Sequence, residues 1–205
     1  MSQWDNLAND QIIKKTAQAL SANGIETFIV ENGVKAKEKA LELIPQSSEI
    51  LTMTSVTLDT IGLSEEINKK DGKYKPVRDK LYSMDAKTQG QEMKRLGSSP
   101  AYAIGSVHAV TEEGQILVAS ATGSQLPAYS YGSTGVLWVV GGQKIVKNVQ
   151  DGIKRIYEHV LPLESERARK AYGVPGSSVN KILIINKEFQ PGRIKLILVK
   201  EKLGF

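Results

Sequence analysis

The segment from Gly135 to Gly142, GVLWVVGG, is the stretch that decides the fold. Its core, VLWVV, is an uninterrupted apolar run that is far too short to span a bilayer. A strand that is apolar on both faces is typical of the interior of a parallel sheet, where both faces are covered. The segment therefore predicts a central strand in a mainly parallel sheet with helices on both faces.

Helix and strand signals alternate in the part of the chain before residue 70. An amphipathic helix between Asn9 and Asn23 precedes the strand IETFIV, and a second helix that starts after Asn32-Gly33 ends before Pro45. The strand EILTM then leads directly into TSVTLDTIGLSEEI, which has a helical pattern after its Thr/Ser start. This alternation favours an α/β fold with a parallel sheet.

The rest of the chain adds an antiparallel element to this pattern. Helical spacing continues from Val77 to a stop at Gly97–Pro100, and the segment HAV-TEEG-QILVAS predicts a small hairpin. An amphipathic helix from Val149 to Val160 precedes a separate short helix that begins at Pro162. KILIINKE and RIKLILVK are the last predicted strands, and without a repeat or linker we expect one domain over residues 1–205.

Composition narrows the possible functions. The chain contains no cysteine, which excludes disulfides and thiolate metal sites and suits a cytoplasmic protein. The N-terminus lacks the apolar core of a signal peptide, so we expect no membrane partner. The net charge is +5, but lysines alternate with glutamates, as in KAKEKALE, which predicts a solvated surface and no nucleic-acid partner. The two histidines lie too far apart in the sequence to indicate a metal site, and no cofactor motif is present.

Three polar segments at predicted strand ends suggest a binding site. They are the LTM-TSVTLD junction, SATGSQLPAYSYGSTG and VVGG-QK. Glycine permits close backbone approach to a ligand, and hydroxyls with free N–H groups hold anionic oxygens. Ligands of open α/β sheets bind beyond the carboxyl ends of the strands. These segments also suit ordinary loops and helix caps, and that alternative stays open. The candidate ligand-binding residues are Thr54, Ser55, Thr57, Ser106, Ser120, Gly123, Ser124, Gln125, Gly141, Gly142 and Lys144.

Several long segments resemble the LUD-domain family, which includes LutC/YkgG-type proteins associated with lactate utilisation. They are ENGVKAKEKALELIP, TSVTLDTIGLSE, EMKRLGSSPAYAIGSVHAVTEEGQILVASATGSQLPAYSYG and PGRIKLILVKEKLGF. The chain looks like a short, stand-alone member. The resemblance implies a fold of the NagB/RpiA/CoA-transferase-like kind.

Glu112 is the candidate catalytic residue. Its turn, TEEG, resembles the E-x-G turn that carries the nucleophilic glutamate in one class of CoA transferases. A carboxylate of this kind attacks an acyl thioester and forms a covalent intermediate. The competing interpretation is an exposed hairpin turn without a catalytic role.

Two functions follow from the sequence. The first is binding of a small anionic metabolite, either a carboxylate or a phosphorylated compound, linked to the use of lactate or another organic acid. The second is an enzyme on the same fold that uses Glu112 for acyl-transfer, isomerase or hydrolytic chemistry. A homo-oligomer stays open, as does a regulatory role through the surface.

Overall fold

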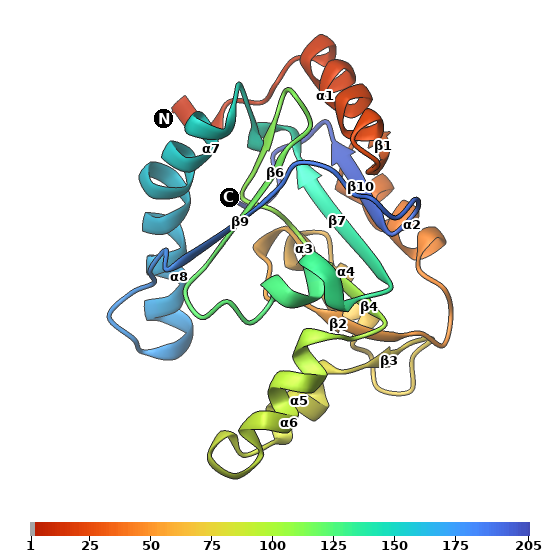
Figure 1. Ribbon diagram of the computed structural model, residues 1–205, viewed down its shortest axis with the longest axis vertical. Coiled ribbons are helices and arrows are strands. Elements are labelled where there is room, and N and C mark those ends of the chain that lie inside the picture. The colour runs from red at the N-terminus through yellow and green to blue at the C-terminus, as the bar shows by residue number, and fades with distance from the viewer. Residues whose placement is uncertain (1–2) are drawn as a thin grey trace.

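A six-stranded parallel sheet forms the centre of the computed structural model, which describes residues 3–205 (Figure 1). The strand order is β1-β10-β7-β4-β2-β3, and every neighbouring pair is parallel. The prediction of a mainly parallel α/β sheet is confirmed. The strands are β1 (Glu26–Val30), β10 (Ile194–Val199), β7 (Gly135–Gly141), β4 (Tyr102–Gly105), β2 (Glu49–Thr52) and β3 (Lys75–Pro76).

Strand β7 lies in the interior of this sheet, between β10 and β4, and all of its residues are buried. Successive side chains of a strand point to opposite faces. Trp138 therefore joins the apolar cluster on one face, whereas Leu137 and Val139 join the cluster on the other. This two-sided burial explains why the segment is apolar without alternation. The Trp138 ring packs edge-to-face on Tyr129, with ring centroids 5.2 Å apart.

Three helices cover one face of the parallel sheet. Helix α2 (Gly33–Leu43) contributes Ala36 and Ala40 to this core. Helices α3 (Val56–Thr60) and α4 (Leu63–Ile67) contribute Leu58 and Leu63. The sequence predicted one helix here, but Gly62 adopts a left-handed conformation, with φ 65°, and separates the two.

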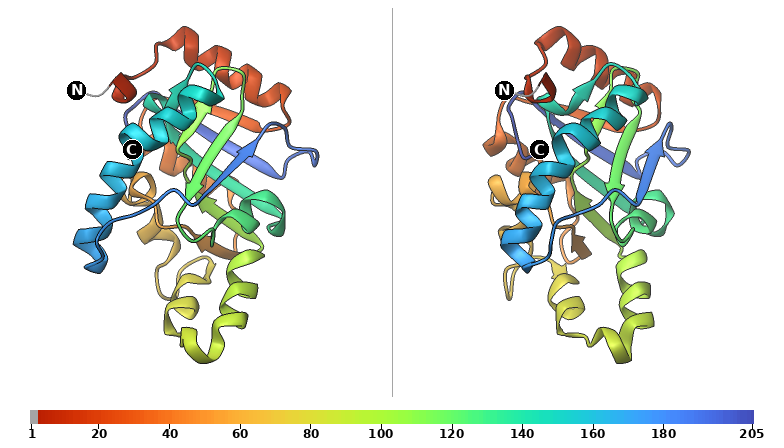
Figure 2. Two further views of the ribbon diagram at one scale, coloured as in Figure 1. Left: turned by 60° about the vertical axis from the view of Figure 1, so that its left-hand side comes forward. Right: turned by 90° about the vertical axis from the view of Figure 1, so that its left-hand side faces the viewer.

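Helix α1 (Asp10–Ala22) and a second sheet cover the other face (Figure 2). This four-stranded sheet has the order β8-β5-β6-β9, and its β5–β6 pair is antiparallel, which confirms the predicted hairpin. Helical residues 149–172 pack against the outer side of the second sheet through Ile156. The strands are β8 (Ile145–Val146), β5 (Ala109–Thr111), β6 (Ile116–Ser120) and β9 (Lys181–Ile185).

Residues 149–172 form one continuous helical segment rather than two separate helices. It comprises α7 (Val149–Arg155), the π-helical turn η4 (Ile156–Val160) and α8 (Leu161–Tyr172). The Leu161 amide donates to the carbonyl of Ile156, five residues back. The widened turn lies immediately before Pro162, which has no N–H to donate, so the helix continues where the sequence predicted a new start.

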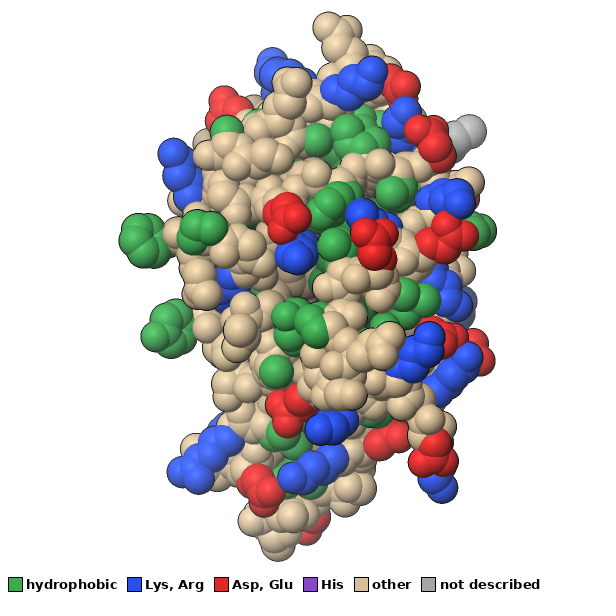
Figure 3. Space-filling model, turned by 90° about the vertical axis from the view of Figure 1, so that its right-hand side faces the viewer, with side chains coloured by type: hydrophobic (Ala, Val, Ile, Leu, Met, Phe, Trp, Pro, Cys, Tyr) green, Lys and Arg blue, Asp and Glu red, His purple; other side chains and the backbone are tan. Residues whose placement is uncertain are grey.

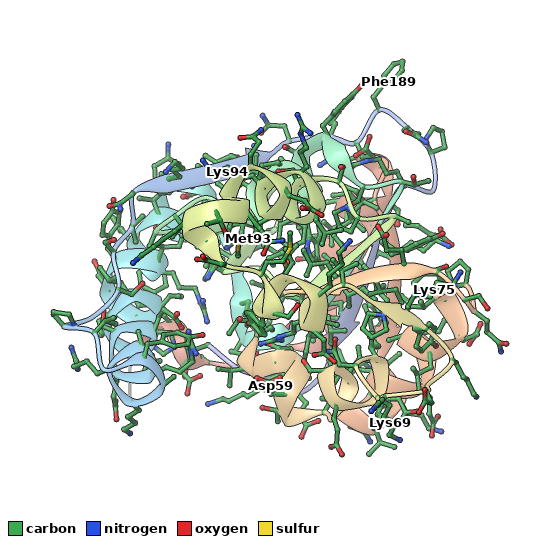
Figure 4. The ribbon with its side chains drawn as sticks, turned by 90° about the horizontal axis from the view of Figure 1, so that it is seen from below. Asp59, Lys69, Lys75, Met93, Lys94 and Phe189 are labelled. Atoms are coloured by element: carbon green, nitrogen blue, oxygen red, sulfur yellow. The ribbon has the colours of Figure 1, made fainter. Side chains whose placement is uncertain are left out.

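A two-helix arm projects from the lower end of the molecule (Figures 1 and 2). The sequence predicted one helix, but α5 (Arg78–Ser83) ends at Met84, whose backbone is extended. Asp85 then caps α6 (Ala86–Ser98), with its carboxylate accepting from the Lys87 amide. Neither helix contains a buried residue. Figure 4 views the arm from below, with Met93 and Lys94 labelled on α6.

Three short helical turns complete the chain: η1 (Gln3–Asp5), η2 (Ala128–Gly132) and η3 (Gly142–Lys144). The loop before β10 is held on η2 by Arg193, which pairs with Glu188 and donates to the Tyr129 carbonyl. Phe189 at the tip of this loop stands clear of the body (Figure 4).

Candidate functional site

The carboxyl ends of β2, β4 and β7 lie side by side, because these three strands are parallel neighbours. After β2 the chain leaves towards α3, α4 and the outer strand β3, whereas after β4 it leaves towards the second sheet and β7. The two connections therefore diverge between β2 and β4. This is the position at which open α/β sheets bind ligands.

Lys144 lies at the centre of this region, although it is only 2% exposed. Its Nζ atom lies 3.0 Å from the Thr57 hydroxyl on α3 and 3.1 Å from the Ser106 hydroxyl after β4. The Thr57 hydroxyl donates its own hydrogen to the carbonyl of Leu203 and therefore accepts from Lys144. The three residues come from three chain segments that follow β2, β4 and β7.

The C-terminal segment holds the Lys144 backbone in place. The Gln143 side chain donates to the carbonyls of Leu203 and Gly204 and accepts from the Leu203 amide. A Cβ atom on Gly141 would lie 2.2 Å from the Gln143 Oε1 atom and 2.7 Å from the Leu203 amide nitrogen. Gly141 is therefore required by packing, because a larger side chain would displace the Gln143 side chain or the Leu203 backbone.

Arg155 and His108 extend the polar cluster towards the second sheet. Arg155 is fully buried, and it donates to the carbonyls of His108 and Trp4. Its Nη2 atom has no hydrogen-bond partner among residues 3–205. The His108 Nδ1 atom accepts from the Ala119 amide, so the hydrogen of the neutral ring lies on Nε2. We call Thr57, Ser106, His108, Lys144 and Arg155 the Lys144 cluster.

The cluster contains buried positive charge without a matching carboxylate. Within residues 3–205, no Asp or Glu oxygen lies within ion-pair distance of Lys144 or Arg155. Burial, and secondarily Arg155, lowers the pKa of Lys144 well below its usual value. Burial also lowers the pKa of Arg155 to about 10, against a smaller opposing effect of Asp5. Uncompensated buried cations are costly, so the cluster is poised to accept a negative charge.

Both histidines of the chain lie near these cations. Burial, with smaller contributions from Lys144 and Arg155, lowers the pKa of His108 to about 3. Burial and the same two cations lower the pKa of His159, although Asp5 opposes them. The buried Nε2 atom of His159 has no hydrogen-bond partner in the described part of the chain. Both rings are therefore neutral near pH 7 and add no positive charge of their own.

Comparison with known proteins identifies the family. The model of the LUD domain matches residues 13–199. The chain belongs to the LUD-domain family. A crystal structure of a DUF162 family protein from Deinococcus radiodurans is similar to this LUD domain, with a TM-score of 0.59 and 11% sequence identity over 95% of this chain and 99% of that one. At this identity the likeness concerns the fold alone. A comparison with curated proteins found no match.

Of the predicted binding residues, the LUD domain joins Thr57, Ser106 and Lys144 through direct hydrogen bonds. Thr54 and Ser55 lie just before α3 and have other partners. Ser55 caps the helix by accepting from the Leu58 amide at 3.4 Å, and Thr54 accepts from Arg78 at 3.4 Å. Gly142 is buried at the start of η3, next to the Gly141 packing site.

The predicted binding loop from Ser120 to Gln125 closes on itself. The Ser120 hydroxyl accepts from the Gly123 amide at 2.8 Å and bonds to the Gln125 side chain at 3.0 Å. Ser124 bonds to Thr122, whose carbonyl accepts from Lys181 on β9. Among the described residues, none of these hydrogen bonds reaches the Lys144 cluster directly. The loop is linked to the cluster indirectly, through Ala119, whose carbonyl accepts from Gln125 and whose amide donates to His108.

Glu112 lies against helix α1 rather than among the strand-end hydroxyls. Its carboxylate pairs with the Nζ atom of Lys15 at 2.8 Å. The turn is fixed on the same helix, because Asn23 donates to the Glu113 carbonyl. Glu113 is exposed, as expected for its neighbour in a turn. This geometry gives no support to a catalytic role for Glu112.

Sequence reasoning missed Arg155. One signal was present: Arg155 lies within the apolar stripe of the predicted amphipathic helix, next to Ile156 and three residues after Gly152. A cation in such a stripe requires a buried partner. The hydrogen bonds between the Gln143 side chain and the C-terminal segment had no local signal, because Gln143 and Leu203 are sixty residues apart.

Two further observations concern the surface. Figure 3 shows one face of the molecule, where basic and acidic side chains are interspersed without a large block of one sign. No helix within residues 3–205 is long and apolar enough to cross a bilayer. Two hollows on the surface lie elsewhere, along α1, β1 and the loop before β10, and neither is lined by a residue of the Lys144 cluster.

Proposed function

We propose that this LUD domain binds a small anionic metabolite, a carboxylate or a phosphorylated compound, at the Lys144 cluster. The observation that carries the proposal is the pair of buried cations, Lys144 and Arg155, without a carboxylate partner among residues 3–205. A bound anion would supply the missing charge and would accept hydrogen bonds from Lys144 and from the free Nη2 atom of Arg155.

The position of the cluster supports the same proposal. It lies where the connections after β2 and β4 diverge, and two of its members, Ser106 and His108, are only half-buried. We propose that a ligand approaches the buried amine past these two residues. Lactate and other organic acids are the first ligands to test, because the family resemblance points to organic-acid utilisation.

A thermal-shift screen tests the proposal with lactate, phosphate, a sugar phosphate and coenzyme A. A ligand at a hundred times its Kd stabilises the folded state by about 2.7 kcal/mol, which produces a clear shift in Tm. We expect at least one of the four to stabilise the wild type. Lys144→Met should abolish that shift, since it removes the cation but preserves much of the side-chain volume.

Two control variants make the screen specific. Lys147 is exposed and three residues from Lys144, so Lys147→Met removes an equal charge from the surface and should leave the shift unchanged. Glu112→Gln should also bind as the wild type does, because Glu112 contacts α1. The proposal is wrong if no ligand stabilises the wild type, or if Lys144→Met responds as strongly as Lys147→Met.

A further inference from the structure

The Lys144 side chain has the surroundings of a nucleophilic amine. Its Nζ atom is buried between two hydroxyl groups, without a carboxylate at ion-pair distance in residues 3–205. An amine attacks a carbonyl only when it is unprotonated. Removal from water next to another cation increases the unprotonated fraction of the amine, which exchanges with the protonated form that holds an anion. Arg155 supplies that second cation, and burial with Arg155 lowers the pKa of Lys144.

We propose that Lys144 forms a covalent imine with a small carbonyl compound that also carries an acidic group. The inference rests on the proposed anion site and adds a reaction to it. In the first step the Nζ lone pair forms a bond to the carbonyl carbon, the π electrons move to oxygen, and the oxygen takes up the proton that nitrogen loses. Loss of water from this carbinolamine gives the imine. Amine and carbonyl are thus converted to imine and water, without an oxidant or reductant.

The two hydroxyl groups beside the amine have different roles in this step. The hydrogen of Thr57 is committed to the Leu203 carbonyl, so Thr57 only accepts from Lys144 and positions it. Ser106 accepts from Lys144, and its own hydrogen has no acceptor among the hydrogen bonds of the described chain. Ser106 is also half-buried rather than enclosed. Ser106 is therefore the group placed to donate to the carbonyl oxygen and to the departing hydroxyl.

Arg155 provides the recognition of the acidic group. Its Nη1 and Nε atoms are held by the carbonyls of His108 and Trp4, which leaves the buried Nη2 atom as the unused donor. The His108 carbonyl lies only two residues along the chain from Ser106, which contacts Lys144. A guanidinium group binds carboxylate or phosphate oxygens. The substrate class is therefore a small oxo acid or a phosphorylated aldehyde or ketone.

Borohydride trapping tests the inference on the intact wild-type protein. The protein is incubated with pyruvate or with dihydroxyacetone phosphate, and sodium borohydride then reduces any imine to a stable secondary amine. Mass spectrometry of the intact chain and of its peptides locates the adduct. We expect one adduct per chain, on Lys144, with at least one of the two compounds. Absence of an adduct with both compounds, or labelling spread over surface lysines, overturns the inference.

Matched variants and a second measurement separate this inference from the proposed function. Lys144→Arg retains a cation but cannot form an imine, so it should lose the adduct, whereas Lys147→Arg should be labelled as the wild type is. Thermal shifts with lactate and phosphate, which have no reactive carbonyl, report the anion site alone. If these anions stabilise the wild type and no adduct forms, the imine is wrong and the anion site stands. If no adduct forms and none of the four screened ligands stabilises the wild type, both proposals fail.

Discussion

Lys144 is the residue on which the proposed anion binding depends, and its burial without a carboxylate partner is costly for stability. Replacing a buried charge that has no partner by an apolar side chain of similar volume is often neutral or stabilising by about 1–4 kcal/mol. We expect Lys144→Met to be at least as stable as the wild type in urea unfolding at pH 7, although it no longer binds the anion. Thr57 bonds to Leu203 independently of Lys144, and we expect it to keep that bond in the variant.

The stability of Lys144→Met should also depend less on pH. The folded-state pKa of Lys144 lies well below 10.5, so between the two values the unfolded chain binds more protons than the folded chain. Wild-type stability therefore gains from rising pH in that window, and the variant lacks this gain. A large loss of stability in Lys144→Met at pH 7 would show that the lysine is structural.

His108 predicts a second pH effect, at the acidic end. The pKa of its ring is about 3 in the folded state against an ordinary value of 6.5, so below pH 6.5 the unfolded chain gains a proton that the folded chain does not. Stability should fall as the pH drops. The upper limit of this residue's contribution at about pH 4.5 is about 2.7 kcal/mol, and we expect a smaller loss because His108 is only half-buried as a residue. His108→Gln keeps an acceptor for the Ala119 amide and should show a smaller difference between pH 7 and pH 4.5 in urea unfolding. An equal difference in both proteins would contradict the assignment.

At the scale of the elements, the end of β4 is packed too tightly for any side chain. A Cβ atom on Gly105 would lie 1.9 Å from the hydroxyl of Tyr129, whose ring is fully buried on Trp138. Gly105→Ala should destabilise the fold by roughly 1–3 kcal/mol or more, because the ring must move within a packed core.

A glycine in the helical arm provides the matched control for that substitution. Gly97 lies in α6, and a Cβ atom there would meet nothing within 4 Å. Gly97→Ala should be neutral or stabilising by up to about 1 kcal/mol, since alanine is the better helix former. Thermal unfolding of both variants decides the comparison, and equal Tm values would show that β4 and Tyr129 are not packed as described.

Some helices, strands and turns can be predicted from local sequence alone, and others cannot. The VLWVV run and the TEEG turn determine a buried strand and a hairpin by themselves, and both predictions are confirmed. The break between α5 and α6 was missed because helical periodicity continues through it, and Asp85, which acts through a single cap, was the local signal. At Pro162 the error was the opposite. The proline was interpreted as the start of a new helix, whereas a π-helical turn carries the helix through it.

At the scale of the whole molecule, the candidate site exists only after the chain has folded. Thr57, Ser106 and Lys144 were among the predicted residues because each follows an expected strand end. Their meeting depends on the order of β2, β4 and β7, and Arg155 joins them only because the second sheet brings α7 over the same edge. Neither arrangement is encoded in a local pattern. The Ser120–Gln125 loop was predicted on composition, and its polar groups bond to one another and to β9.

The most direct measurement is a crystal structure of the protein soaked with the anion that gives the largest thermal shift. We expect an oxygen of the ligand to accept from the Lys144 Nζ atom and from the Arg155 Nη2 atom, in a position reached past Ser106. Density for the anion at another place, with Lys144 still bonded only to Thr57 and Ser106, would contradict the assignment of the site.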